Sequence, residues 1–158
     1  MSPAEQASTD TAGVLAPPPL VYAIPLVAGL LIQRSRPIQL VPAGMAVPIG
    51  VALVALGLVG IPAILAFRRA RTSPKPWKPT TALVTDGPFR YSRNPMYLGF
   101  TLLYVGISAW VNAAWPIFFL PVVLGVMHFG VVVREEAYLE RRFGVEYRAY
   151  RERVRRWI

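Results

Sequence analysis

The chain has 158 residues, of which 54% are hydrophobic, and its formal net charge is +9 at pH 7. A soluble domain rarely combines such hydrophobicity with so much basic charge, whereas a small membrane protein with basic loops commonly does. Cysteine is absent and His128 is the only histidine. Disulfides, thiolate catalysis and a multi-histidine metal centre are therefore excluded, and no metal site is expected.

The basic residues flank apolar runs instead of forming a soluble basic face. We therefore expect membrane lipids with anionic headgroups, and not nucleic acid, to be the counter-charge. The sequence leaves the oligomeric state undetermined.

Residues 1–16 are rich in Pro, Ala and Thr and contain no Lys or Arg. A secretory signal needs a basic start, so this composition predicts a disordered tail. Residues 17–158 are expected to form a single membrane domain.

Four apolar runs follow in chain order, at residues 17–32, 41–67, 96–114 and 115–133. The first is short, and the second contains several glycines that offer close-packing surfaces. The last two are joined so closely that they should be antiparallel neighbours. The pattern predicts an all-α, polytopic membrane bundle of about four transmembrane helices: residues 17–67 give two spans, residues 68–94 a cytoplasmic loop, and residues 95–158 the last two spans and a tail.

The distribution of positive charge predicts the orientation of this bundle. Residues 68–93 carry seven Lys or Arg and residues 134–158 carry eight, whereas only Arg34 and Arg36 lie on the other side. Because basic loops remain in the cytoplasm, both termini should be cytoplasmic. We expect a multi-pass protein, located in the inner membrane if the source is bacterial.

The polar stretch at residues 81–99 separates the second and third apolar runs. An Asp-Gly-Pro turn at residues 86–88 is followed by an Asn-Pro pair at residues 94–95, where Asn should cap a helix that begins with Pro. Arg90 and Arg93 precede this helix. They suit either a cradle for a carboxylate or phosphate, or ordinary membrane-surface anchors.

Glu135 and Glu136 follow the last apolar run directly, on the side of these arginines. Ionisable groups at that depth are costly and mark function, although they also suit pairing with Arg134 at a helix end. His128 precedes them by seven and eight residues, which predicts the same helical face. It is either a packing residue or a base.

The C-terminal residues contain a second amphipathic pattern. Tyr147, Tyr150, Val154 and Trp157 recur at three- and four-residue spacing, opposite several arginines. The pattern predicts a basic C-terminal interfacial helix from about Val145, which either lies on the lipid surface or folds back over a site.

These motifs resemble a known family. The sequence GPFRYSRNPMYLG at residues 87–99, followed at residues 135–150 by EE-x-x-L-x-x-x-FG-x-EY-x-x-Y, is similar to the isoprenylcysteine carboxyl methyltransferase and phospholipid methyltransferase family of integral membrane enzymes. The resemblance covers residues 81–158. It implies S-adenosyl-L-methionine as the methyl donor, bound in a cytoplasmic pocket, and a lipophilic methyl acceptor that arrives through the membrane.

The resemblance also implies site residues by position. The cofactor-binding residues would be Thr81, Ala82, Leu83, Val84, Phe89, Asn94, Pro95, Met96, Tyr97 and Glu135, and the catalytic residues Arg93, Arg134 and Glu136. Prenylcysteine enzymes resemble R-H-P where this chain has Asn94, and they carry a substrate-binding arginine where it has Val131. Asn94 resembles the phospholipid and general bacterial members, and Val131 argues against a prenylcysteine carboxylate acceptor unless Arg134 substitutes for the missing arginine.

The expected function is methyl transfer to a lipid or lipophilic small molecule with a carboxylate, thiol or amine head. Such an enzyme mainly aligns the reacting groups and excludes water. An amine acceptor would also need a base, for which Glu136 and His128 are candidates. Two alternatives are an NADPH-dependent membrane reductase of the sterol type and a non-enzymatic lipid-binding protein. No glycine-rich phosphate or dinucleotide loop is present.

Overall fold

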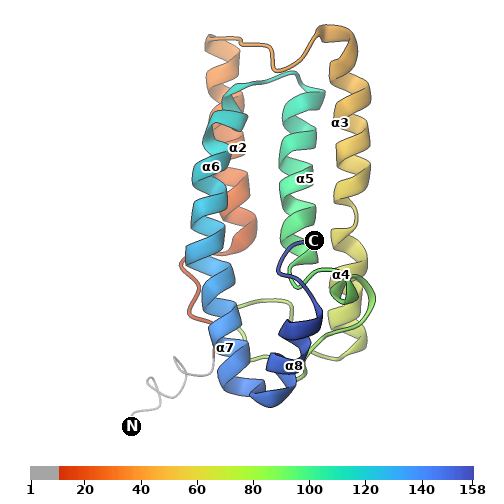
Figure 1. Ribbon diagram of the computed structural model, residues 1–158. Helices are drawn as coiled ribbons and strands as arrows, with labels where there is room; N and C mark the ends of the chain where they lie inside the picture. The colour runs from red at the N-terminus through yellow and green to blue at the C-terminus, as the bar shows by residue number, and fades with distance from the viewer. Residues whose placement is uncertain (1–10) are drawn as a thin grey trace.

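The computed structural model describes residues 11–158, which are helical without any strand. Four helices stand side by side, and shorter ones continue them or cover one end (Figure 1). The predicted all-α class is confirmed. The helices are α2 (Pro18–Ser35), α3 (Ala43–Gly57), α4 (Gly60–Arg69), α5 (Pro95–Trp110), α6 (Trp115–Met127), α7 (Val133–Phe143) and α8 (Val145–Arg153), with a 3-10 turn at Gly87–Arg90 and a π-helical turn at His128–Val132.

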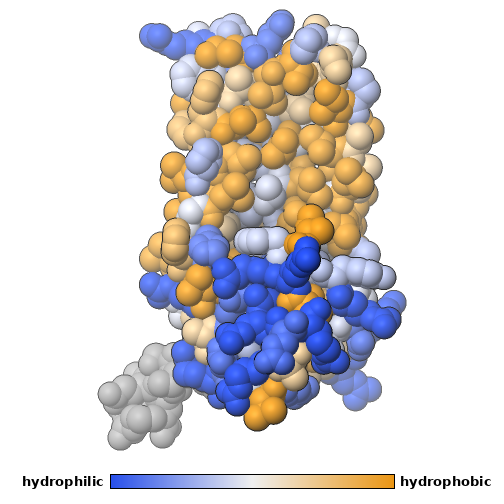
Figure 2. Space-filling model, in the orientation of Figure 1, coloured by the Kyte–Doolittle hydropathy of each residue, from blue (hydrophilic) through white to orange (hydrophobic). Residues whose placement is uncertain are grey.

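Two helical stretches are long and apolar enough to cross a membrane, Ala43–Arg69 and Trp115–Phe143, while α5 is apolar but shorter. The outer surface of the bundle is apolar (Figure 2), with Leu56, Phe118 and Val122 among the exposed side chains. Such a surface is stable only in an apolar solvent. A membrane bundle is therefore supported, whereas only two of the four predicted spans meet the length and hydropathy expected of one.

Both basic regions lie at the same end of the bundle, as predicted. Hydrophilic residues gather at the end formed by the α4–α5 loop, α7, α8 and the C-terminal residues (Figure 2). The backbone N–H of Arg93 donates to the carbonyl of Arg155 at 3.0 Å, which joins the two regions directly. We call this end the polar cap.

Glycines allow α3 and α4 to approach α5 closely. A Cβ atom added to Gly50 would lie 2.4 Å from the backbone of Trp110, and one added to Gly99 would lie 2.9 Å from the carbonyl oxygen of Gly57. The close-packing role predicted for the glycines of the second apolar run is thus confirmed for Gly50, and for Gly57, whose added Cβ would lie 2.8 Å from the side chain of Leu103. It is wrong for Gly44, whose added Cβ would have no neighbour within 4 Å.

The last two apolar runs form α5 and α6, which a tight turn joins and which run in opposite directions (Figure 1). The hydroxyl of Tyr104 on α5 donates to the carbonyl of Pro116 on α6 at 2.7 Å. Their main partners are nevertheless other helices, because α5 packs on α3 and α6 packs on α2. Gly29 allows the α2–α6 contact, since a Cβ there would lie 2.6 Å from Pro116.

The fourth apolar run is not a regular helix. A π-helical turn at His128–Val132 separates α6 from α7. The expectation that His128 shares a face with the two acids is therefore wrong, because it assumed the residue spacing of an uninterrupted α-helix.

The C-terminal helix is shorter than predicted. It ends at Arg153, and Val154 is extended with φ −122° and ψ 128°. Gly144, at φ 51°, separates α7 from α8, as its position predicted. Tyr147 and Tyr150 are buried against the protein. Of the two alternatives for this segment, the structure has the one in which it folds back.

Residues 1–10 of the predicted disordered tail lie outside the described residues. The remaining part, residues 11–16, differs from the prediction because its backbone N–H at Leu15 donates to the carbonyl of Gly130 at 2.9 Å. Val14 packs against the main hydrophobic cluster. The prediction rested on the average composition of residues 1–16, which does not show that residues next to the first helix contact the bundle.

The glycine contact between α3 and α5 can be tested with matched substitutions. We expect Gly50→Ala to destabilise the protein by about 1–3 kcal/mol, because the new methyl group would overlap the backbone of Trp110. Gly125→Ala, in α6, is the control: its Cβ would have no neighbour within 4 Å. Thermal unfolding in detergent, followed by circular dichroism, measures both. Equal midpoints for the two variants would contradict the close contact.

Candidate functional site

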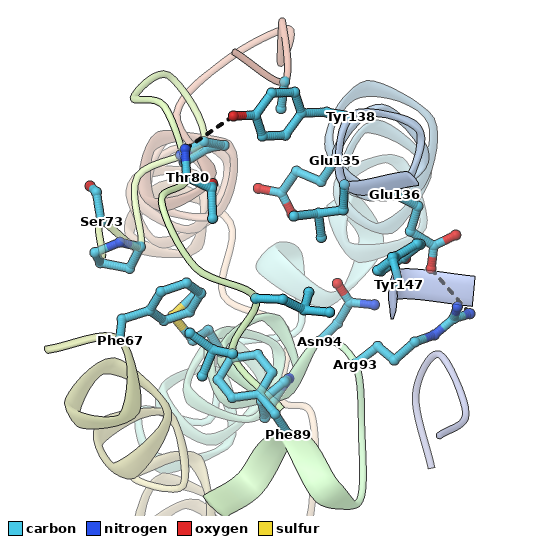
Figure 3. Close-up of a pocket in the computed structure, with 18 of the residues that line it drawn as sticks. Phe67, Ser73, Thr80, Phe89, Arg93, Asn94, Glu135, Glu136, Tyr138 and Tyr147 are labelled. Atoms are coloured by element: carbon cyan, nitrogen blue, oxygen red, sulfur yellow. Dashed lines mark hydrogen bonds and ion pairs between the residues drawn. The ribbon is translucent and has the colours of Figure 1, made fainter. Parts of the chain in front are cut away.

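A cavity opens in the polar cap, between the start of α5, the start of α7, α8 and the loop that precedes the 3-10 turn (Figure 3). Its free space, including the part open to solvent, is about 790 Å³.

The cavity brings together most of the residues that the sequence predicted for the site. They come from both parts of the family motif, although a long stretch of chain separates those parts. The predicted residues that line it are Ala82, Leu83, Val84, Phe89, Arg93, Asn94, Pro95, Met96, Tyr97, Glu135 and Glu136.

Two predicted site residues do not line the cavity. Thr81 is exposed and its backbone N–H donates to Thr72 Oγ1 at 2.9 Å, whereas its neighbour Thr80 does line the cavity. Arg134 is also exposed, and its Nη1 donates to the carbonyl of Gly13 at 2.9 Å. In both cases an adjacent residue points to the cavity, because successive side chains of an extended segment or a helix point in different directions.

Two further candidates also lie elsewhere. Arg90 is exposed on the 3-10 turn, and His128 is half-buried with its ring 4.7 Å from that of Phe129. Neither lines the cavity. Within residues 11–158, no group of three His, Asp or Glu side chains is arranged to hold a metal ion.

Glu135 and Tyr97 form the first polar contact inside the cavity. The Tyr97 hydroxyl donates to Glu135 Oε1 at 2.6 Å, which links the first turn of α5 to the first turn of α7. Tyr97 is only 3% exposed. A carboxylate in such an enclosed place is costly unless it accepts hydrogen bonds, so this contact stabilises Glu135 and fixes its direction.

Glu136 is the centre of a second cluster, which includes two arginines. Arg156 binds it with both ends of its guanidinium, Nε to Oε1 at 3.0 Å and Nη2 to Oε2 at 2.7 Å. Arg93 Nη2 lies 3.2 Å from Oε1. The Glu136 side chain is 13% exposed and that of Arg93 is 9% exposed, so water weakens this cluster less than a surface ion pair.

The residues after α8 cross the start of α5 and are held there by their backbone. The carbonyl of Arg155 accepts from the N–H of Arg93 at 3.0 Å, and the carbonyl of Arg156 accepts from Asn94 Nδ2 at 3.0 Å. The predicted cap is therefore wrong in one respect. Helix α5 begins at Pro95, but the Asn94 side chain makes no cap and binds the C-terminal segment instead.

The sequence did not assign three tyrosines to the cavity: Tyr138, Tyr147 and Tyr150. The Tyr138 hydroxyl accepts from the N–H of Thr80 at 3.0 Å, and the Tyr150 hydroxyl donates to the carbonyl of Phe89 at 2.8 Å. Burial raises the pKa of Tyr147 to about 12 and raises that of Tyr150 as well, so both stay protonated. The spacing of the last two was visible in the sequence, but it fitted a lipid-facing stripe equally well.

The phospholipid methyltransferase family matches residues 45–146. The chain belongs to this family. The predicted resemblance to the integral membrane methyltransferases is thereby confirmed, and membership of a methyltransferase family supports an enzyme. An uncharacterized protein of Haemophilus influenzae is 39% identical over 71 residues, which are 40% of this chain and 100% of that protein. No solved structure matches significantly.

The Arg156 side chain links the residues after α8 to Glu136 at the start of α7. We expect the loss of this side chain's charge to loosen the C-terminal segment. Arg156→Gln should cost about 1 kcal/mol and speed hydrogen exchange at the Arg93 amide about fivefold, because that amide is bound to the segment. Arg155→Gln removes the same charge from the neighbouring exposed position. Exchange measured by mass spectrometry should be unchanged in this control, and equal acceleration in both variants would contradict the anchoring role.

Proposed function

We propose that this protein transfers a methyl group from S-adenosyl-L-methionine to a lipophilic acceptor at the cytoplasmic face of the membrane. The observation that carries the proposal is the cavity at the junction of apolar bundle and polar cap, which both parts of the family motif line. A water-soluble donor and a membrane-dissolved acceptor can meet only at such a boundary.

The residues in the cavity fit the donor chemically. Phe89, Met96 and Leu83 give an apolar and aromatic wall suited to a flat base, and Glu135 offers a carboxylate that accepts from ribose hydroxyls or an ammonium group. When bound, the donor would supply a methyl group already activated on a sulfonium. The tyrosine-lined wall would exclude water, and the chain would contribute alignment of the reacting groups.

The structure also narrows the choice of base for an amine acceptor. Glu136 lines the cavity, whereas His128 does not. The cavity lining therefore favours Glu136 over His128, and Glu136 would accept the proton of an amine only after a contact of Arg156 or Arg93 to its oxygens breaks. A carboxylate or thiolate acceptor would need no base.

A second, apolar groove suggests how the acceptor is held. Val59, Leu98, Trp157 and Ile158 line it, and Pro95 lines both the groove and the cavity. The groove favours a lipid tail between the start of α4, α5 and the C-terminal segment, with its head directed past Pro95.

Orientation in the membrane follows from the charges. The polar cap holds both basic regions, and the positive-inside rule directs such an end to the cytoplasm. In this proposal the protein is multi-pass: α2 and α5 cross the membrane beside the helical stretches Ala43–Arg69 and Trp115–Phe143, which are long and apolar enough to span it.

Binding of the donor tests this function. We expect Glu135→Gln to weaken S-adenosyl-L-methionine binding about ten- to a hundredfold, because the substitution keeps the shape and the Tyr97 hydrogen bond but removes the charge. Glu140→Gln is the control, since Glu140 lies on the same helix but pairs at the surface with Arg151 at 2.9 Å. Calorimetry in detergent, with NADPH as a second titrant, measures both.

Two results would contradict the proposal. One is tight binding of NADPH without binding of the methyl donor, which would favour the reductase alternative. The other is unchanged donor affinity in Glu135→Gln. If the methyl donor binds as expected, transfer of labelled methyl groups into lipids of reconstituted vesicles, compared between the same variants, identifies the acceptor.

A further inference from the structure

Arg93 is a buried charge of the cavity that the described residues satisfy only in part. Its side chain is 9% exposed, and only its Nη2 lies near an acid, 3.2 Å from Glu136 Oε1. Its Nε and Nη1 are buried and have no hydrogen-bond partner among the described residues. Buried N–H groups almost always find an acceptor, and a charged one without an acceptor is strongly destabilising. The arrangement therefore indicates that an acceptor comes from outside the chain.

Glu136 does not satisfy Arg93, because Arg156 already occupies both of its oxygens. Those two contacts are 3.0 and 2.7 Å long, both shorter than the contact to Arg93. Two guanidinium groups thus share one carboxylate, and the cluster keeps a net positive charge. Figure 3 shows the contact of Arg93 with Glu136. The neighbouring acid Glu135 is bound to Tyr97 and is not paired with Arg93.

The position of Arg93 is fixed, which suits it for binding a ligand. Its N–H is bound to the carbonyl of Arg155 and its side chain lines the cavity. Helix α5, of 16 residues, begins two positions later at Pro95. The positive end of that helix adds to the attraction for an anion.

We propose that Arg93 is the oxyanion-binding group of this cavity and takes a carboxylate or phosphate group of the bound ligand. The proposal rests on the proposed function, in which the donor brings an amino-acid carboxylate and a phospholipid acceptor brings a phosphate. The unpartnered N–H groups at Nε and Nη1 of Arg93 can each donate a charge-assisted hydrogen bond to either anion. Arg156 acts as a positioning residue, because it occupies Glu136 and so leaves Arg93 available.

Two pairs of ligands, each differing only in the anion, test the proposal. The first pair is S-adenosylhomocysteine and its analogue without the carboxylate. The second, measured without any donor, is lysophosphatidic acid, a lysophospholipid whose head is the phosphate alone, and a monoacylglycerol with the same acyl chain. For the pair whose anion contacts Arg93, we expect the wild-type protein to bind the anionic member about ten- to a hundredfold more tightly. Arg93→Gln should bring that ratio close to one.

Two other variants separate this role from general damage to the fold. Arg90→Gln removes an exposed arginine outside the cavity and should leave the ratio unchanged. Arg93→Lys keeps a positive charge at the same position but lacks the planar guanidinium, so it should give a ratio between one and that of the wild type. This variant tests the proposal if Arg93→Gln does not fold.

The outcomes distinguish this proposal from the proposed function. A loss of the ratio in the first pair identifies the donor carboxylate as the anion, and a loss in the second pair identifies the phosphate. If the donor binds but both ratios persist in Arg93→Gln, or if Arg93→Lys leaves them at the wild-type value, the anion subsite is refuted while donor binding stands. If the donor does not bind, the proposed function fails, and the lysophospholipid pair still tests Arg93.

Discussion

The ion pair between Glu136 and Arg156 joins two segments that the apolar bundle by itself would not hold together, the start of α7 and the residues after α8. The same segment binds the backbone of Arg93 and the side chain of Asn94. These contacts bring α8 over the cavity, where Tyr147 and Tyr150 form one wall. Without them the cavity would be an open notch at the end of the bundle. Its enclosure, and the burial of the charges inside it, therefore depend on this polar connection.

The fold separates two kinds of surface with little overlap. An apolar bundle, in which glycines allow α3 and α5 to touch along their length, ends in a polar cap made from the loop before α5 and the C-terminal residues. The cavity lies where the two meet. The proposed enzyme takes one ligand from water and one from the bilayer, and a cavity at this boundary lies next to both.

Much of this architecture could be predicted, because hydropathy, glycine spacing and charge distribution are properties of whole segments. The start of α5 at Pro95 and the convergence of Glu135 with the NPMY sequence at residues 94–97 were also predictable from the family motif. The errors among the predicted cavity residues concern single side-chain directions. Thr81 and Arg134 are each one position away from a residue that does line the cavity, and a pattern of residues does not specify direction that finely.

The C-terminal segment illustrates a different limit. The spacing of Tyr147 and Tyr150 predicted an apolar face, and burying that face in lipid or in protein satisfies the hydrophobic effect equally. What decides between them is the set of long-range contacts to Glu136 and Asn94. Such contacts bring together residues that are distant along the chain, so no local pattern could reveal them. The wrong cap at Asn94 has the same cause.

The π-helical turn at His128–Val132 determines which way each face of α7 points. Such a turn holds one residue more than an α-helical turn, so it rotates everything beyond it by about 100° relative to α6. The directions of the Glu135 and Glu136 side chains thus depend on this five-residue turn, although the turn precedes both residues. The carbonyl of Gly130 within it accepts the N–H of Leu15. The direction of the two acids therefore depends on the number of residues in this helical turn. The N-terminal residues bind the chain at the same turn, where the helix changes from α to π.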